Sequence, residues 1–312
     1  MIAFVYPGQG AQYVGMGESI AARYPAAAAL FARASAVLGF DLLALCTRGP
    51  EARLRATENT QPAVLVTALA CAAALEIHGV RPGAVAGLSL GEYAALVSAG
   101  VLEFEDAVWL VRQRGLFMQE AAAGRETAMA ALIGVEAEQV ERLCAAHRHL
   151  GVVEPANYNG AGQIVIGGDA AAVRAAAEAA RAAGARRAVL LAVSAPFHTS
   201  LMAPAAERLA EALERVRLAD AALPVVSNVT AEPVRRAEEI RRLLVRQVVS
   251  PVRWEESVRR LAAMGASAFV EAGPGTTLSG LIRKTVPAAV LHIEDVPSLE
   301  RSLQGLGAGV NP

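Results

Sequence analysis

A serine between two glycines, Ser89, constrains the fold of this chain more than any other feature. The run at 84–93 reads AVAGLSLGEY and contains the pattern Gly-x-Ser-x-Gly. Where a strand precedes this pattern and a helix follows it, the serine sits on a strained turn that exposes its hydroxyl at the edge of a sheet. Glycines suit such a turn because they have no Cβ atom to crowd the backbone. The apolar and alanine-rich flanks therefore predict an α/β protein in which Ser89 is a candidate nucleophile.

The composition fits a large folded chain and argues against two other classes. The chain has 312 residues, 54% of them hydrophobic, so it suits one large domain or a domain with an inserted subdomain. A formal net charge of −1 argues against nucleic-acid binding, which needs a basic surface. The longest apolar stretch, 62–75, is too short to span a bilayer, so we expect a buried helix there and no membrane association.

The cysteines and the N-terminus indicate a cytoplasmic protein. Cys46, Cys71 and Cys144 are odd in number and irregularly spaced, without a C-x-x-C pair. Such cysteines are typical of reduced, buried thiols rather than of disulfides, redox groups or metal ligands. The N-terminus lacks the basic segment of a secretory signal peptide and soon enters a glycine-rich loop. We therefore expect a cytoplasmic location and no bound metal.

The first part of the chain, 1–125, predicts an α/β-hydrolase-like large subdomain with a parallel sheet. A strand rich in β-branched and aromatic residues precedes a glycine-rich loop, which is how α/β sheets commonly begin. Long helical crossovers between few strands also suit a parallel sheet. The expected elements are strands at 2–6 and 84–87 and helices at 16–38, 53–57, 62–78, 91–99 and 104–123.

The middle of the chain, 126–194, predicts a small inserted subdomain. Its elements follow the order strand, helix, strand, strand, helix, strand, which is the ferredoxin-like order. The run NGAG at 159–162 is a hairpin signal between the two central strands. The alternative is that these strands extend the main sheet. The expected strands are 128–133, 152–159, 163–167 and 187–193, and the expected helices are 136–146 and 170–183.

We expect the large subdomain to resume over 195–297 and a flexible, glycine-rich tail at 298–312. The expected elements of the second part are helices at 202–216, 237–248, 254–264 and 277–284 and strands at 225–228 and 268–271.

A serine hydroxyl needs a base, and His198 is the strongest candidate among the five histidines. It lies where the chain returns from the insertion to the main fold, and loops at such junctions line clefts. His78, His147 and His149 are expected at the surface, whereas His292 lies in a late apolar strand. No acidic residue obviously completes a triad, so a backbone carbonyl is a candidate for holding the imidazole tautomer.

Backbone N–H groups and an arginine complete the candidate site. Leu90, at the start of a helix, can supply one oxyanion N–H, and the loop at Gln9 can supply another if its strand neighbours the elbow strand. Arg112 and Arg114 cannot share one helix face, so one of them points inward. A buried Arg114 needs a partner, which is either a substrate carboxylate or a structural salt bridge.

Several motifs together resemble the malonyl-CoA:acyl carrier protein transacylases and the related acyltransferases of polyketide synthases. They agree with that family in order and interval over about residues 3–284, which makes the likeness specific. The family's α/β-hydrolase-like body with a ferredoxin-like insertion agrees with the expected organisation. The matching segments are Pro7–Gly10, Thr60–Ala63, Gly87–Tyr93, Gln113–Gly115, Phe197–His198, Ser227–Val229, Gln247–Trp254 and Glu271–Gly275.

The resemblance implies that a malonyl group passes from malonyl-CoA to the phosphopantetheine thiol of a holo acyl carrier protein. Ser89 would carry the acyl group, and His198 would act as base and then as acid. Arg114 would pair with the malonyl carboxylate, and Gln247 would lie beside His198. Coenzyme A thioester would be a substrate, and no cofactor is implied. Gln9 and Leu90 would form the oxyanion hole.

Two positions bear on the substrate and the pathway. Leu88 stands where many family members have histidine, a pattern similar to free-standing acyltransferases that serve polyketide synthases in trans. This favours polyketide synthesis over fatty-acid synthesis. The acyl carrier protein could then be a carrier domain of a polyketide synthase. Phe197, before the histidine, resembles the malonyl-selective pattern, since a bulky ring leaves no room for an α-methyl branch.

Two other functions fit part of the pattern. A proofreading hydrolase that strips stalled acyl groups from carrier proteins shares the elbow and the histidine, but a hydrolase of neutral acyl groups has no use for Arg114. A non-catalytic module that docks carrier proteins does not need Ser89, His198 and Arg114 together. We therefore expect a transferase.

Overall fold

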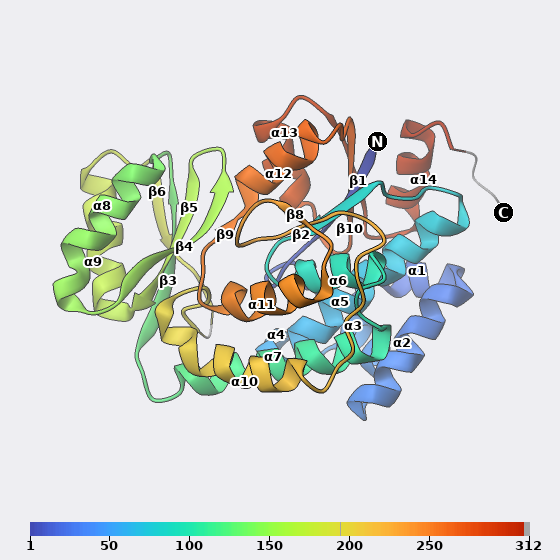
Figure 1. Cartoon of the computed structure of the whole chain (residues 1–312), viewed down its shortest axis with the longest axis horizontal. Helices are drawn as coiled ribbons and strands as arrows, with labels where there is room; N and C mark the ends of the chain where they lie inside the picture. The colour runs from blue at the N-terminus through green and yellow to red at the C-terminus, as the bar shows by residue number, and fades with distance from the viewer. Residues whose placement is uncertain (194, 309–312) are drawn as a thin grey trace.

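Two sheets organise the chain, one in each of two subdomains (Figure 1). The computed structural model describes residues 1–193 and 195–308. The large sheet has the order β11 (Ala289–Ile293), β10 (Ala268–Ala272), β1 (Ile2–Tyr6), β2 (Ala84–Gly87), β7 (Val225–Val226) and β8 (Pro233–Val234). The small sheet has the order β6 (Arg187–Leu190), β3 (Thr127–Ile133), β5 (Gln163–Asp169), β4 (Val153–Gly160) and β9 (Val252–Arg253).

The large sheet is parallel from β11 to β7, and β8 adds an antiparallel edge. Parallel sheets are covered on both faces, which explains why the central strands are almost wholly apolar. Phe4 and Tyr6 pack into a cluster with helices on one face, whereas Ala3 and Val5 pack with Trp254 and its neighbours on the other. This fold confirms the predicted α/β class with its parallel sheet.

Helices cover both faces of the large sheet (Figure 1). The helices along the chain are α1 (Glu18–Arg23), α2 (Pro25–Leu38), α3 (Leu42–Arg48), α4 (Glu51–Arg55), α5 (Thr57–Ile77), α6 (Gly91–Ser98), α7 (Phe104–Ala122), α8 (Ala137–His147), α9 (Ala170–Ala182), α10 (Ala203–Leu213), α11 (Ala237–Val248), α12 (Trp254–Ala263), α13 (Thr277–Thr285) and α14 (Val296–Gly305). Short 3-10 helices lie at Arg148–Leu150 and Ser200–Met202.

Helix α5 runs through the core of the large subdomain. Of the described helices it is the one that by itself is long and apolar enough to cross a membrane, and 83% of its most apolar window is buried inside the protein. It is longer than the predicted apolar stretch because it begins at Thr57 with a buried polar turn. In that turn Thr60 donates to the carbonyl of Leu54, so its hydroxyl is satisfied without water.

The small subdomain has the predicted ferredoxin-like element order. Strands β3, β4, β5 and β6 pair antiparallel, and α8 and α9 pack on one face around Val140, Val173 and Ile166. Strand β9, from the later part of the chain, pairs in parallel with β4. Because that strand joins the small sheet from outside 126–194, the residue boundaries of the subdomains stay a proposal. Ser194 lies outside the described residues.

The predicted flexible tail is wrong for 298–308. Residues 296–305 form α14, which opens with a capping box between Asp295 and Ser298. Leu299 and Leu303, four residues apart on one helix face, are fully buried in the core. The glycines near the end of the chain favoured the prediction of a flexible tail over a helix with Leu299 and Leu303 on one face. The part of the predicted tail at 309–312 lies outside the described residues.

Three smaller differences have local causes. The predicted helix at 16–38 is divided into α1 and α2 because Tyr24 is extended before Pro25. Helix α3 at 42–48 was not predicted, although Asp41 caps its first turn. His78, expected at the surface, is buried with a hydrogen bond of 3.0 Å between its Nε2 and the hydroxyl of Tyr24.

We predict that Leu303→Ala lowers the free energy of unfolding by about 2–5 kcal/mol, since it leaves a cavity where a buried leucine packs. Gln304→Ala, at an exposed position of the same helix, is the control and should change stability by less than about 0.5 kcal/mol. Urea denaturation followed by circular dichroism measures both. Equal stability of the two variants would mean that α14 does not belong to the core.

Candidate active site

Ser89 occupies a strained turn between β2 and α6. Its φ angle is +54°, in the left-handed region that non-glycine residues seldom adopt. The two flanking glycines are required by close packing. A Cβ at Gly87 would lie 2.0 Å from the backbone of Gly91, and a Cβ at Gly91 would lie 2.1 Å from the carbonyl oxygen of Tyr6. The turn therefore has the geometry that the Gly-x-Ser-x-Gly pattern predicts.

Asn228, two residues after the end of β7, holds this turn in place. Its Oδ1 accepts a hydrogen bond of 2.6 Å from the backbone N–H of Ser89, and its Nδ2 donates to the carbonyl of Gly87 at 2.7 Å. Both atoms of one amide thus hold the two sides of the elbow. Sequence reasoning found Asn228 only as part of a matching segment and gave it no role. The predicted strand at 225–228 ends at Val226, and the fully buried Asn228 turns to the elbow instead.

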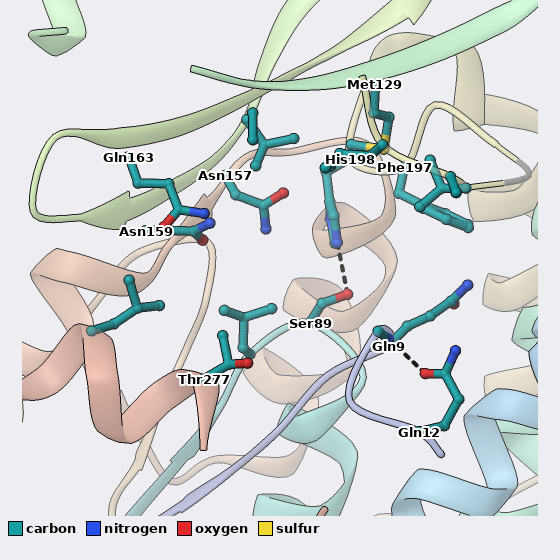
Figure 2. A pocket seen from close by; sticks show the side chains of 18 of the residues that line it. Gln9, Gln12, Ser89, Met129, Asn157, Asn159, Gln163, Phe197, His198 and Thr277 are labelled. Carbon is teal, nitrogen blue, oxygen red and sulfur yellow. Dashed lines mark hydrogen bonds between the residues drawn. The ribbon is translucent and has the colours of Figure 1, made fainter. Parts of the chain in front are cut away.

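His198 lies against the serine (Figure 2). Its Nε2 is 2.7 Å from Ser89 Oγ, and its Nδ1 is 2.9 Å from the backbone carbonyl of Gln247. Because a carbonyl can only accept, Nδ1 carries the proton and Nε2 is left to accept from the serine hydroxyl. Burial, and after it the positive charge of Arg114, lowers the pKa of His198 to about 4. The imidazole is therefore neutral at physiological pH.

Arg114 points into the same place. Its Nη2 donates to Ser89 Oγ at 3.1 Å and to Gln247 Oε1 at 3.1 Å, and its Nη1 donates to Gln61 Oε1 at 2.9 Å. The side chain is buried, and among the described residues it forms no salt bridge. The salt-bridge alternative raised by the sequence therefore does not hold. Arg112 faces elsewhere and bonds to Asn59 and the Glu58 carbonyl.

Gln247 connects these groups from α11. Besides holding His198 through its carbonyl, it donates from Nε2 to the backbone carbonyl of Ser89 at 3.1 Å. The same Nε2 donates to Glu92 Oε2 at 2.6 Å. Burial raises the pKa of Glu92 to about 7, while the hydrogen bonds from Gln247 and Asn228 favour the ionised form. Glu92 was not among the predicted site residues, because its position three residues after Ser89 was the only sign of a role in the site.

The two candidate oxyanion donors flank the serine. Strands β1 and β2 are neighbours with Tyr6 opposite Gly87, so the loop that carries Gln9 starts beside the elbow. Gln9 lines the cavity next to Ser89 (Figure 2). Leu90 is buried at the N-terminus of α6, where backbone N–H groups lack helical partners. The positions suit the predicted roles, which stay predictions.

A cavity of about 690 Å³ opens over Ser89 between the two subdomains. That size is ordinary for a small-molecule site. Apolar side chains line part of it, among them Leu88 and Phe197. Amide side chains from the small sheet also line it (Figure 2). These are Asn157, Asn159 and Gln163. Among the described residues no group of three or more His, Cys, Asp or Glu side chains is placed to hold a metal ion.

The fold and the site together define an α/β protein in which a serine on a nucleophile elbow is hydrogen-bonded to a histidine from another segment. The chain belongs to the acyl transferase domain family, whose model matches residues 3–308. This confirms the family resemblance that the sequence motifs indicated. The chain is 44% identical over 307 residues to the malonyl CoA-acyl carrier protein transacylase of Bacillus subtilis, covering 98% of this chain and 97% of that protein.

Solved structures agree over the whole fold. The crystal structure of MCAT from Streptococcus pneumoniae is 46% identical with a TM-score of 0.94, covering 98% of this chain and 100% of that chain. A structure described as a type II PKS acyl-carrier protein, AntF, in complex with its malonyl-transacylase, PlMCAT, is 43% identical with a TM-score of 0.95. It covers 97% of this chain and 99% of that chain.

We predict that Ser89 becomes unreactive only at low pH. Since the pKa of His198 is about 4, the neutral base persists well below the usual value of 6.5. The rate of labelling by a neutral fluorophosphonate should stay level from pH 7 to about pH 5 and fall as pH approaches 4. Between pH 6.5 and pH 4 the unfolded chain binds more protons at His198 than the folded chain does, so the free energy of unfolding falls as the pH is lowered. The labelling therefore needs short reactions after a pH jump.

The control for this measurement is His198→Ala, which should react slowly and without that acid limb. A fall in wild-type labelling centred near pH 6.5 would contradict the prediction.

Proposed function

We propose that this acyltransferase moves a malonyl group from malonyl-CoA to the phosphopantetheine thiol of a holo acyl carrier protein through an ester on Ser89. One observation carries the proposal: Ser89 Oγ lies 2.7 Å from the Nε2 of a neutral histidine and 3.1 Å from a buried guanidinium. A single hydroxyl thus faces a base and a fixed positive charge. The malonyl transacylases among its relatives support the same substrate.

In the first half of the proposed cycle, His198 Nε2 takes the proton of Ser89 as Oγ attacks the thioester carbonyl. The oxyanion forms beside the backbone N–H groups of Leu90 and Gln9. The tetrahedral species then collapses, the carbon–sulfur bond breaks, and His198 returns its proton to the leaving thiolate of coenzyme A. The imidazolium that forms in between is stabilised by its Nδ1–H bond to the Gln247 carbonyl.

The second half reverses the roles. His198 takes the proton of the carrier thiol, the thiolate attacks the ester carbonyl, and Ser89 leaves with the proton from Nε2. The cycle as written uses these side chains, the backbone N–H groups of Leu90 and Gln9, the malonyl thioester and the carrier thiol. Water can attack the same ester, and the apolar side chains of Leu88 and Phe197 that line the cavity favour transfer by leaving water few hydrogen-bond partners there.

Arg114 selects the acyl group in this proposal. Its guanidinium fork matches a carboxylate in shape and charge, and among the described residues it forms no salt bridge, so a substrate carboxylate would supply its counter-ion. The low dielectric of a buried site strengthens the attraction between the guanidinium and the carboxylate. We propose malonyl as the preferred unit because Phe197 and Leu88 border the cavity where an α-methyl branch would extend.

The carrier protein and the pathway follow from weaker observations. Leu88 before the serine favours supply of polyketide synthesis in trans, and one relative was solved with a type II polyketide synthase carrier protein. Fatty-acid synthesis is the other pathway that such a transfer supplies. We place the enzyme in the cytoplasm, since its three cysteines are free thiols in buried positions.

We predict that radiolabelled malonyl-CoA labels the wild-type protein and leaves Ser89→Ala unlabelled, because the ester oxygen is lost. Scintillation counting after denaturing gel electrophoresis measures the label, and circular dichroism shows that the variant is folded. Label that persists on Ser89→Ala would refute the proposed ester. Free malonate released without carrier protein as fast as transfer would identify a hydrolase instead.

We predict that Arg114→Ala weakens malonyl transfer by about 2–5 kcal/mol in kcat/KM and acetyl transfer far less, because only malonyl loses a charged partner. Mass spectrometry of a holo carrier protein, after reaction with each acyl-CoA, measures both. Arg112→Ala, which alters a nearby arginine facing away from the serine, is the control. Equal losses for the two acyl groups would mean that Arg114 is structural.

A further inference from the structure

Glu92 is a buried carboxyl group that the proposed cycle does not use. It lies three residues after Ser89 on α6, and its side chain is shielded from solvent. Its Oε2 accepts two hydrogen bonds, one of 2.6 Å from Gln247 Nε2 and one of 3.2 Å from the backbone N–H of Asn228. Burying a carboxyl group is costly unless its oxygens accept hydrogen bonds. The two partners are the residues that hold the histidine and the elbow.

The side-chain amide of Gln247 lies between Glu92 and Arg114. Its Nε2 faces the carboxyl group, and its Oε1 accepts from Arg114 Nη2 at 3.1 Å. Glu92 Oε2 accepts both of its hydrogen bonds, and a guanidinium only donates them. The amide can therefore satisfy both neighbours in one orientation alone, with nitrogen toward Glu92 and oxygen toward Arg114.

We propose that Glu92 is a positioning residue for malonyl recognition, which acts by orienting the Gln247 amide so that an amide oxygen, and not a carboxylate, holds Arg114. The bridge keeps the negative and positive groups one amide apart. Arg114 is thus fixed in place by the neutral oxygens of Gln61 and Gln247 while its charge stays available to the substrate. A direct ion pair with Glu92 would compete with the malonyl carboxylate for the same fork.

A second contact of Glu92 connects this bridge to the nucleophile. Asn228, whose backbone N–H donates to Glu92, holds the elbow through its own side chain. Burial raises the pKa of Glu92 to about 7, and the hydrogen bonds from Gln247 and Asn228 and the charge of Arg114 oppose that rise. One carboxyl group therefore contacts both residues that position the serine, the histidine and the arginine.

The inference rests on the proposed role of Arg114 in binding malonyl, and three variants test it. In Glu92→Leu the acceptor is lost, so kcat/KM for malonyl-CoA should fall at least about tenfold more than for acetyl-CoA, mainly through KM. In Glu92→Gln the amide oxygen can replace Oε2, so the malonyl-to-acetyl ratio should stay within about threefold of wild type. Should Glu92→Leu fail to fold, Glu92→Asp, which ends one methylene short of Gln247, must show the malonyl-specific loss.

Glu271→Leu is the matched control. Glu271 is also a buried carboxyl group that accepts two N–H groups, from Leu278 at 3.0 Å and Ser279 at 2.7 Å, and none of the hydrogen bonds among the described residues joins it to Gln247 or Arg114. Its replacement should lower stability and leave the malonyl-to-acetyl ratio unchanged. Equal losses for the two acyl groups in Glu92→Leu, or a ratio lost in Glu92→Gln as well, would overturn the inference.

Arg114→Ala, measured in the same assay, separates this inference from the proposed function. If Arg114→Ala loses malonyl selectivity and Glu92→Leu keeps it, the positioning role is wrong and the proposed function stands. If Arg114→Ala itself keeps the selectivity, the proposed carboxylate clamp is wrong, and the role of Glu92 is wrong with it.

Discussion

The buried charge of Arg114 is the constraint on which the rest of the site depends. A guanidinium cannot lose its proton in a protein, so burial must be offset by hydrogen bonds or by a counter-ion. This chain supplies neutral oxygens from Gln61, Gln247 and Ser89 and no salt bridge among the described residues. Burial, and after it the same charge, lowers the pKa of His198, so the imidazole is neutral and can accept a proton. The charge of Arg114 thus affects the state of the base as well as the serine that it contacts.

The local part of this arrangement could be predicted from the sequence, and the long-range part could not. Strand β2, the glycine turn and helix α11 were predicted because apolar runs, Gly-x-Ser-x-Gly and helical periodicity are written in neighbouring residues. Asn228 and Glu92 escaped notice because their bonds join positions more than a hundred residues apart. A buried polar side chain far from its partner in sequence looks like any other polar residue.

The same limit explains the error at the end of the chain. Leu299 and Leu303 have helical spacing, but two leucines near several glycines are too few to predict a buried helix. What buries them is the face of the large subdomain, which local pattern does not describe. Conversely, spacing alone left Arg114 equally open to a structural salt bridge, and it gave Gln247 no role. The family motifs indicated a place beside the serine and the histidine for both residues. The motifs carried information about contacts that composition and periodicity lack.

The segment after Gln247 also joins the small sheet to the large subdomain. A few residues later the chain forms β9, where Val252 pairs with Asn157 of the small sheet. In the same strand the N–H of Arg253 donates to the carbonyl of Asn228 at 2.9 Å. Backbone hydrogen bonds therefore connect Asn228, and the segment that follows Gln247, to the strand of the small sheet that carries Asn157. A shift of the small sheet would therefore act on Gln247 and Asn228 together.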